Sequence, residues 1–155
     1  MSIRKRIIED PEAISKIIEQ AEVCYLSMIH KSKPYVIPMN FGYENGVFYL
    51  HSGPGGKKNE ALQENPEVCI ALNINSKLHV RHDHVACSYS MTYESIVAYG
   101  KLEFINDPQL KREYLNIIMK QYTGKTDFKY NDPAIDNVEV MKVQCNEITG
   151  HIRGL

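Results

Sequence analysis

The sequence predicts a mainly β fold, a small antiparallel β-barrel with peripheral helices. Short runs of β-branched and aromatic residues recur along the chain, and short connections separate them. Asn45-Gly46 lies between two such runs and is typical of a hairpin turn. Helix-start signals occur at only a few gaps between the runs, at Asp10-Pro11 and Asp107-Pro108 among them. A parallel sheet would need a helix between most pairs of strands, so we expect antiparallel pairing.

Length and charge limit the classes of protein that this chain can belong to. We expect one domain over residues 1–155, long enough to bury a core. The formal net charge is −1, so the chain lacks the overall positive charge that nucleic-acid binding usually needs. No apolar run approaches the roughly 18 residues that span a bilayer, and no signal peptide is visible. The four cysteines show no CxxC spacing, which favours reduced thiols and a cytoplasmic location.

The first fifty residues predict one helix and a meander of three strands. Asp10 is the expected N-cap of a helix whose apolar face contains Ile14, Ile17 and Ile18. Pro38 lies within the second strand, so that strand should lie at an edge or contain a bulge. The three expected strands are 23–29, 34–43 and 47–51, with a polar turn at 30–33.

The rest of the chain predicts further strands around one long helix. That helix begins at Asp107-Pro108, has an apolar face and ends near Gly124. Residues 75–83 and 125–137 are polar and are expected to be loops. The remaining strands are expected at 68–74, within the extended segment 86–105, and at 138–143.

The stretch from Val47 to Leu62 contains the strongest candidate site. A strand ends in His51-Ser52, a glycine-rich loop follows at 53–56, and Lys57-Lys58 precede a short helix that we expect to be capped by Asn59. Free backbone N–H groups, a helix N-terminus and two lysines together suit a phosphate. The residues alone leave two interpretations open, an anion site and a flexible turn with solvated lysines.

A second candidate is the spacing of His79, His82, His84 and Cys87, which are zinc- or iron-ligand types. A metal site and a polar loop beside a ligand pocket or subunit interface are the two alternatives for this segment. The chain shows no defensible Ser-His-Asp or Cys-His arrangement and no close pair of carboxylates. Such a lack of catalytic side chains fits a protein whose reactive group is a bound cofactor.

Three blocks of the sequence resemble the FMN-binding split-barrel proteins related to pyridoxamine 5′-phosphate oxidase. Within that superfamily they look most like the branch of the 5-nitroimidazole-resistance (Nim) flavoproteins. The blocks run from Phe48 through Lys58 to Leu62, from Cys87 to Lys101, and from Ile148 to His151, and the segment 38–43 resembles the strand that passes the flavin.

The resemblance implies a split β-barrel homodimer with two FMN sites in its interface. It implies that Lys57 and Lys58 bind the FMN phosphate with a contribution from Ser95, and that His51 and Ser52 lie against the flavin. It further implies that Pro38, Met39 and Asn40 run beside the isoalloxazine ring and that Thr149 of the third block contacts the cofactor.

The expected function is therefore that of an FMN-dependent oxidoreductase. Its substrate would be a small molecule such as a nitroaromatic or a pyridoxamine phosphate-like compound, and a reduced nicotinamide would be a suitable donor. Two alternatives stay open, a non-catalytic FMN- or haem-binding protein and a metal protein that uses the histidine segment. No nucleic-acid or membrane partner is expected.

Overall fold

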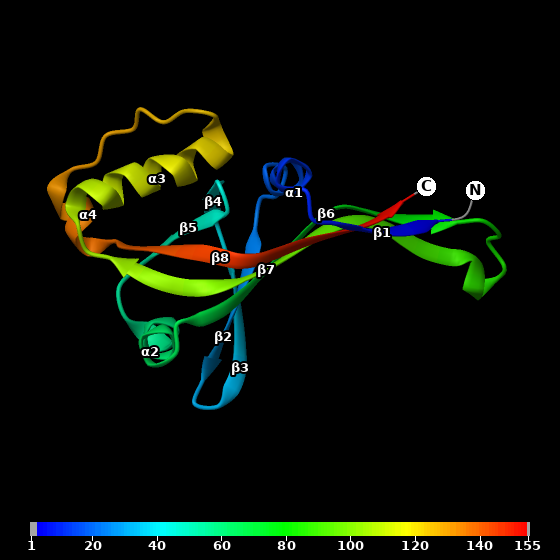
Figure 1. The fold of residues 1–155 in the computed structure, drawn as a ribbon, viewed down its shortest axis with the longest axis horizontal. Helices are drawn as coiled ribbons and strands as arrows, with labels where there is room; N and C mark the ends of the chain where they lie inside the picture. The colour runs from blue at the N-terminus through cyan, green and yellow to red at the C-terminus, as the bar shows by residue number, and fades with distance from the viewer. Residues whose placement is uncertain (1–2, 155) are drawn as a thin grey trace.

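A computed structural model describes residues 3–154, which form one antiparallel sheet and four helices (Figure 1). The strands are β1 (Arg4–Ile8), β2 (Cys24–His30), β3 (Lys33–Met39), β4 (Phe41–Glu44), β5 (Val47–Ser52), β6 (Glu67–Val80), β7 (Tyr89–Ile105) and β8 (Glu139–Gly154). The helices are α1 (Pro11–Ile18), α2 (Gly56–Glu64), α3 (Pro108–Thr123) and α4 (Asp132–Asn137), with one 3-10 turn at Ala86–Ser88. The predicted mainly β, antiparallel fold is confirmed.

The strand order explains how the barrel is split. Hydrogen-bonded neighbours follow the order β3-β2-β6-β7-β8-β5-β4, and β1 pairs with β8. β3 and β4 stand at opposite ends of this order, although only Asn40 separates them in the chain. Their joined ends therefore meet without a hydrogen-bonded ladder, and the barrel stays open at that seam. Both hairpins of the predicted meander are present, β2 with β3 and β4 with β5. The predicted second strand, 34–43, is wrong as one strand, because it is divided at Asn40 into β3 and β4.

Two apolar clusters hold the wider end of the sheet together. The main cluster fills the space enclosed by the curved sheet, α1 and α2, and its fully buried side chains include Leu26, Phe41, Phe48 and Ile70. The second cluster lies where α3 and α4 cover β7 and β8, and it contains Ile105, Leu115, Ile118, Ile135 and Val140. Burial of such side chains contributes about 1.5–3 kcal/mol each, so these clusters fix the end of the molecule that contains α2.

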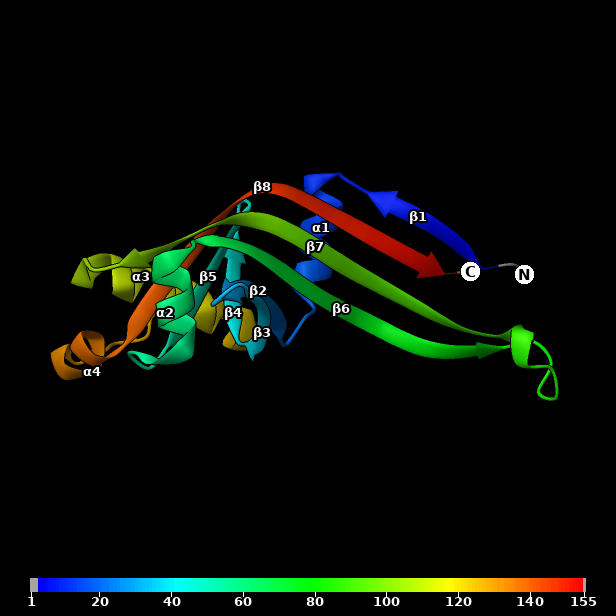
Figure 2. The same cartoon turned by 90° about the horizontal axis from the view of Figure 1, so that it is seen from below.

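β6 and β7 continue as a narrow arm beyond this packed end (Figures 1 and 2). The arm comprises residues 77–80 of β6, 89–92 of β7 and their connection 81–88. Its position near both chain ends is clear in Figure 2, whereas α2, α3 and α4 lie at the other end of the sheet. One face of the arm is apolar and exposed, with Leu78 opposite Met91 and Val80 opposite Tyr89.

Local signals predicted most helix starts and turns correctly. Asp10 caps α1 by accepting from Ala13 N at 2.9 Å, and Asp107 caps α3 by accepting from Leu110 N at 2.9 Å. Asn45 and Gly46 have positive φ angles of 49° and 82°, as a tight hairpin turn between β4 and β5 requires. Pro38 lies in β3, an end strand of the sheet, in agreement with the predicted edge position.

Several predicted boundaries are wrong, and long-range pairing explains each difference. Of the expected loop 75–83, residues 75–80 are instead part of β6, because Lys77 to Val80 pair with β7 beyond an irregularity near Asn75, whereas 81–83 do lie in a connection. The last strand continues to Gly154 instead of ending at Val143, since β7 and β1 pair with its second half. The expected loop 125–137 contains α4, and the basic, exposed β1 has no alternating pattern that would have predicted it.

Candidate functional site

The N-terminus of α2 has backbone N–H donors without an intrahelical partner. Its N-cap is Gly55, with φ 74°, and Gly56 follows with φ 84°. No side chain caps the helix, and its first turn contains no acidic residue. Asn59 was predicted as the cap, which is wrong: the cap is Gly55, four residues earlier, and the two glycines allow the left-handed backbone at that point. Two lysines in this turn oppose the helix dipole, an arrangement that a bound anion would stabilise.

Lys58 is buried and connects α2 to the start of β8. Its side chain donates to Asn59 Oδ1, the Asn59 amide donates to the Glu139 carboxylate, and Lys58 Nζ lies 3.7 Å from Glu139 Oε2. Lys58 is only 9% exposed, and this burial lowers its pKa, while Glu139 acts in the opposite direction. Lys58 therefore contributes a positive charge that a carboxylate already neutralises in part.

Lys57 is the more available cation of the pair. It is exposed, and its Nζ lies 4.3 Å from the centroid of the Tyr35 ring in β3. On the same helix, Glu60 contacts His30 Nε2 of β2 at 3.1 Å. The helix α2 thus spans from the β2–β3 hairpin to β8, and this places its glycine-rich start beside the end of β5.

His51 and Ser52 lie at that end of β5. Ser52 stands directly opposite Glu139 and His51 opposite Val140, so both are beside the partner of Lys58. The Nδ1 atom of His51 is buried and has no hydrogen-bond partner in the part of the chain that the structure describes, and burial lowers the pKa of the imidazole. Ser52 donates to the neighbouring Gly53 carbonyl at 3.0 Å. The unpaired nitrogen of a neutral imidazole is free to bond a polar ligand edge at this site.

The three residues expected beside the flavin ring, at 38–40, lie in three different environments. Met39 is buried opposite Cys24 of β2, so its side chain belongs to the core. The Asn40 amide donates to Glu22 O at 3.3 Å and to Tyr122 Oη at 3.2 Å, which ties the seam of the barrel to α3. Pro38, by contrast, is exposed on the outward face of β3.

Ser95 and Thr149 lie far from the α2 N-terminus within one chain. Val140, the neighbour of His51, pairs with Ile105 of β7, and Ser95 is ten residues from Ile105 on the same strand. At about 3.3 Å per residue this places Ser95 roughly 33 Å along the strand. The structure therefore brings His51, Ser52, Lys57 and Lys58 together and leaves Ser95 and Thr149 apart from them.

Thr149 instead shares a row across the sheet with Pro38. The row runs Pro38, Tyr25, Ala71, Val97 and Thr149, each residue opposite the next, and directly paired residues lie on the same face. We call the outward face of β3, β2, β6, β7 and β8 around this row the outer sheet face. Three of its side chains are large and exposed: Tyr25 is 46%, Val36 57% and Tyr99 48% exposed. Tyrosines in strands more often belong to a core, so the expectation from sequence for Tyr25 and Tyr99 was burial, which is wrong.

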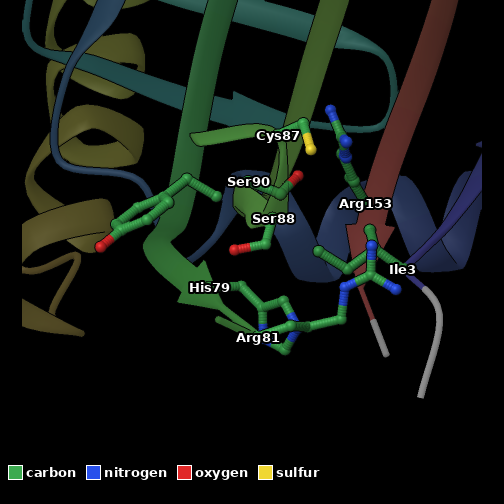
Figure 3. Close-up of a pocket in the computed structure, with 8 residues that line it drawn as sticks. Ile3, His79, Arg81, Cys87, Ser88, Ser90 and Arg153 are labelled. Atoms are coloured by element: carbon green, nitrogen blue, oxygen red, sulfur yellow. The ribbon is translucent and has the colours of Figure 1, made fainter. Parts of the chain in front are cut away.

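The histidine segment does not assemble a metal site. Within residues 3–154, no group of three or more His, Cys, Asp or Glu side chains is placed to hold a metal ion. His82 and His84 are exposed on the connection of the arm, whereas His79 and Cys87 line a cavity together with Arg81 and Arg153 (Figure 3).

Comparison with known proteins agrees with the fold and with the sequence blocks. A family model described as pyridoxamine 5′-phosphate oxidase matches residues 10–152. A search of curated proteins gives no significant match. In the described part of the chain, no helix has both the length and the apolar character needed to cross a membrane.

Solved structures include one similar protein of substantial sequence identity. It is a candidate 5-nitroimidazole antibiotic resistance protein from Bacteroides thetaiotaomicron, 47% identical, with a TM-score of 0.86; the match covers 100% of this chain and 91% of that one. The flavocytochrome Anf3 from Azotobacter vinelandii has a TM-score of 0.82 at 19% identity, over 96% of this chain and 70% of that one. An FAD and haem binding protein from Mycobacterium smegmatis has a TM-score of 0.82 at 14% identity, over 96% and 73%. The last two support the fold alone.

Proposed function

The chain belongs to the pyridoxamine 5′-phosphate oxidase family, and from this membership we propose that it is an FMN-dependent oxidoreductase acting on a small molecule. The observation that supports the proposal most directly is the start of α2. There, free helix N–H groups and the exposed Lys57 follow the end of β5, where Nδ1 of His51 has no partner among the described residues and burial lowers the pKa of the imidazole. A phosphate monoester suits the helix start, and a polar edge of a flavin ring suits the imidazole.

The flavin would supply the redox chemistry, and the residues of this chain would bind and orient it. Lys57 and the α2 N–H groups would hold the phosphate. Lys58 would hold α2 in place through Glu139 and lend part of its charge. His51 Nδ1 would accept or donate one hydrogen bond, according to its tautomer. FMN is preferred to FAD in this proposal because a terminal phosphate fits an open helix start with one freely available cation.

A second copy of the chain would complete the site. The outer sheet face exposes Tyr25, Val36 and Tyr99 beside Pro38 and Thr149, and exposed apolar area of this kind marks an interaction surface. We propose that another copy covers this face in a homodimer. Such packing would bring Ser95 and Thr149 of one copy to the helix start of the other, which one chain alone does not achieve.

The substrate proposal comes from the 47% identical protein, whose name concerns 5-nitroimidazole resistance. A nitroaromatic compound is accordingly the acceptor that we propose to test first, with NADH or NADPH as donor. We also propose a cytoplasmic location, because the four cysteines at 24, 69, 87 and 145 are all free thiols in the structure.

The experiment loads the purified protein with FMN and follows the flavin absorbance without oxygen. The proposal expects NADH or NADPH to bleach the bound flavin and a nitroimidazole to restore its colour over repeated cycles. Free FMN at the same concentration is the control for uncatalysed transfer. Bound flavin that is neither reduced nor reoxidised faster than this control would instead support a non-catalytic flavin-binding protein, and a protein that does not bind FMN would contradict both.

A further inference from the structure

A cavity of about 220 Å³ lies where the arm meets the ends of the chain (Figure 3). Its lining includes His79 and Arg81 near the end of β6, Ser90 of β7, and Arg153 of β8. In Figure 2 the arm and α2 lie at opposite ends of the sheet. Within one chain, the cavity therefore lies apart from the start of α2.

Two guanidinium groups give this cavity positive charge. Arg81 and Arg153 both line it, and within residues 3–154 no carboxylate lies within 4.0 Å of either side chain in an ion pair. Asp83, the nearest acidic residue of the arm in sequence, is instead 3.7 Å from His84. Arginine stays protonated throughout the physiological pH range, and its planar fork suits phosphate oxygens. The cavity thus presents two cationic groups without an acidic partner among the described residues.

Two buried polar atoms beside these arginines also have no hydrogen-bond partner among residues 3–154. They are Nε2 of His79 and Oγ of Ser90, and the two residues stand directly opposite each other in the β6–β7 ladder. The neighbouring Ser88 is different, because its hydroxyl donates to His82 O at 2.5 Å and so holds the connection of the arm. Buried polar groups are nearly always paired, so unpaired ones that line a cavity indicate a missing partner.

We propose that this cavity binds the phosphate group of a small phosphate monoester. Two arginines match the two negative charges of a phosphate monoester, and His79 Nε2 and the Ser90 hydroxyl can each donate to one of its oxygens. The volume is below the range of drug-sized ligand sites, so the organic part of the ligand is small. Inorganic phosphate shares this chemistry and is the simplest probe of the site.

The test measures binding of inorganic phosphate and of phenyl phosphate to the full chain by isothermal titration calorimetry at physiological ionic strength. The proposal expects one site per chain and tighter binding of phenyl phosphate. Arg81→Gln and Arg153→Gln should each weaken binding at least about tenfold, the loss that a charge-assisted hydrogen bond produces. Arg6→Gln removes an equal charge from the exposed β1 outside the cavity, and it should change affinity less than about twofold.

Other outcomes overturn the proposal. They are the absence of saturable binding by the folded wild-type protein, and an equal loss in Arg6→Gln, which would show general attraction to a basic surface. Ser90→Ala keeps all charges and should weaken phosphate binding severalfold with an unchanged melting temperature. If Ser90→Ala and both arginine variants bound phosphate as tightly as the wild type, the phosphate would bind outside this cavity, and the proposal would be overturned.

A final comparison separates this cavity from the flavin site. Lys57→Ala should weaken FMN binding and leave phosphate binding at the cavity unchanged, whereas Arg153→Gln should do the reverse. If FMN displaced the probe and Arg153→Gln weakened FMN but not riboflavin, the cavity would hold the flavin phosphate. That result would overturn the proposal of a second ligand and would also relocate the clamp proposed at Lys57, whereas loss of flavin binding alone would leave the cavity proposal intact.

Discussion

Replacing Lys57 or Lys58 by alanine tests the phosphate clamp at the start of α2. Lys57 is exposed, and the contact of its ammonium group within the chain is a cation–π contact with the Tyr35 ring. Replacing it by alanine therefore removes its proposed contact with the phosphate and disturbs little else. Such a contact contributes about 1.5–3 kcal/mol, and solvent exposure favours the lower end of that range. We therefore expect Lys57→Ala to weaken FMN binding about tenfold.

Lys58→Ala should have the larger effect on FMN affinity. It removes a buried cation and leaves the Glu139 carboxylate, 3.7 Å away, without its ion-pair partner. An uncompensated carboxylate beside a phosphate adds repulsion to the lost attraction, so the expected loss is about 3 kcal/mol, or roughly a hundredfold. Glu139→Gln removes the competing negative charge instead, and it should leave FMN binding unchanged or tighten it.

The assay is quenching of flavin fluorescence, carried out with FMN and with riboflavin, which lacks the phosphate. The ratio of the two affinities isolates the phosphate contribution from any general loss of structure. Lys16→Ala is the matched control, because Lys16 is an exposed residue of α1 whose ion pair among the described residues is with Glu12 at 3.1 Å. An unchanged FMN-to-riboflavin ratio in both Lys57→Ala and Lys58→Ala would refute the reasoning.

Three further predictions concern the scaffold and its response to pH. Gly42→Ala should lower the free energy of unfolding by about 1–3 kcal/mol, because its Cβ would lie 2.8 Å from the Ile117 backbone. Gly53→Ala is the control, since an added Cβ there meets open space. Thermal melts of the two variants should show a lower melting temperature for Gly42→Ala alone. Asp107→Ala should cost about 1 kcal/mol in urea unfolding, as the loss of an N-cap does, and no change would contradict the cap. Burial lowers the pKa of His51, so the unfolded chain binds more protons below pH about 6.5. The free energy of unfolding should therefore fall as the pH drops from about 6.5 towards the lowered pKa of folded His51. In His51→Gln the free energy of unfolding should depend less on pH over this range.

Local chemistry made much of this fold predictable. The Asp-Pro pairs at 10–11 and 107–108 start helices because aspartate caps and proline fits the first turn, and these effects need no distant partner. Asn45-Gly46 likewise sets its hairpin through its own backbone angles. The glycine-rich loop after His51 and the position of Lys57 and Lys58 beside a helix were also predictable, since these residues follow one another directly, although the helix begins at Gly56 and not after Asn59.

Features that depend on strand pairing were not predictable from local signals. Residues 75–80 are part of a strand because β7 pairs with β6, and β1 is a strand because it pairs with β8. Asn59 looks like a cap, yet its amide bonds Glu139, eighty residues away in the chain. The separation of Ser95 from Lys58 is likewise a matter of register, so the spacing of motifs alone did not indicate that one chain cannot unite them.

The most direct test of the central claim is the visible absorption spectrum of the purified protein after FMN is added and excess flavin removed. Our account predicts the bands of oxidised flavin, retained with the protein and lost on addition of dithionite. A protein that stays colourless after this treatment would contradict it, and a Soret band in the protein as purified would point to haem as the resident group.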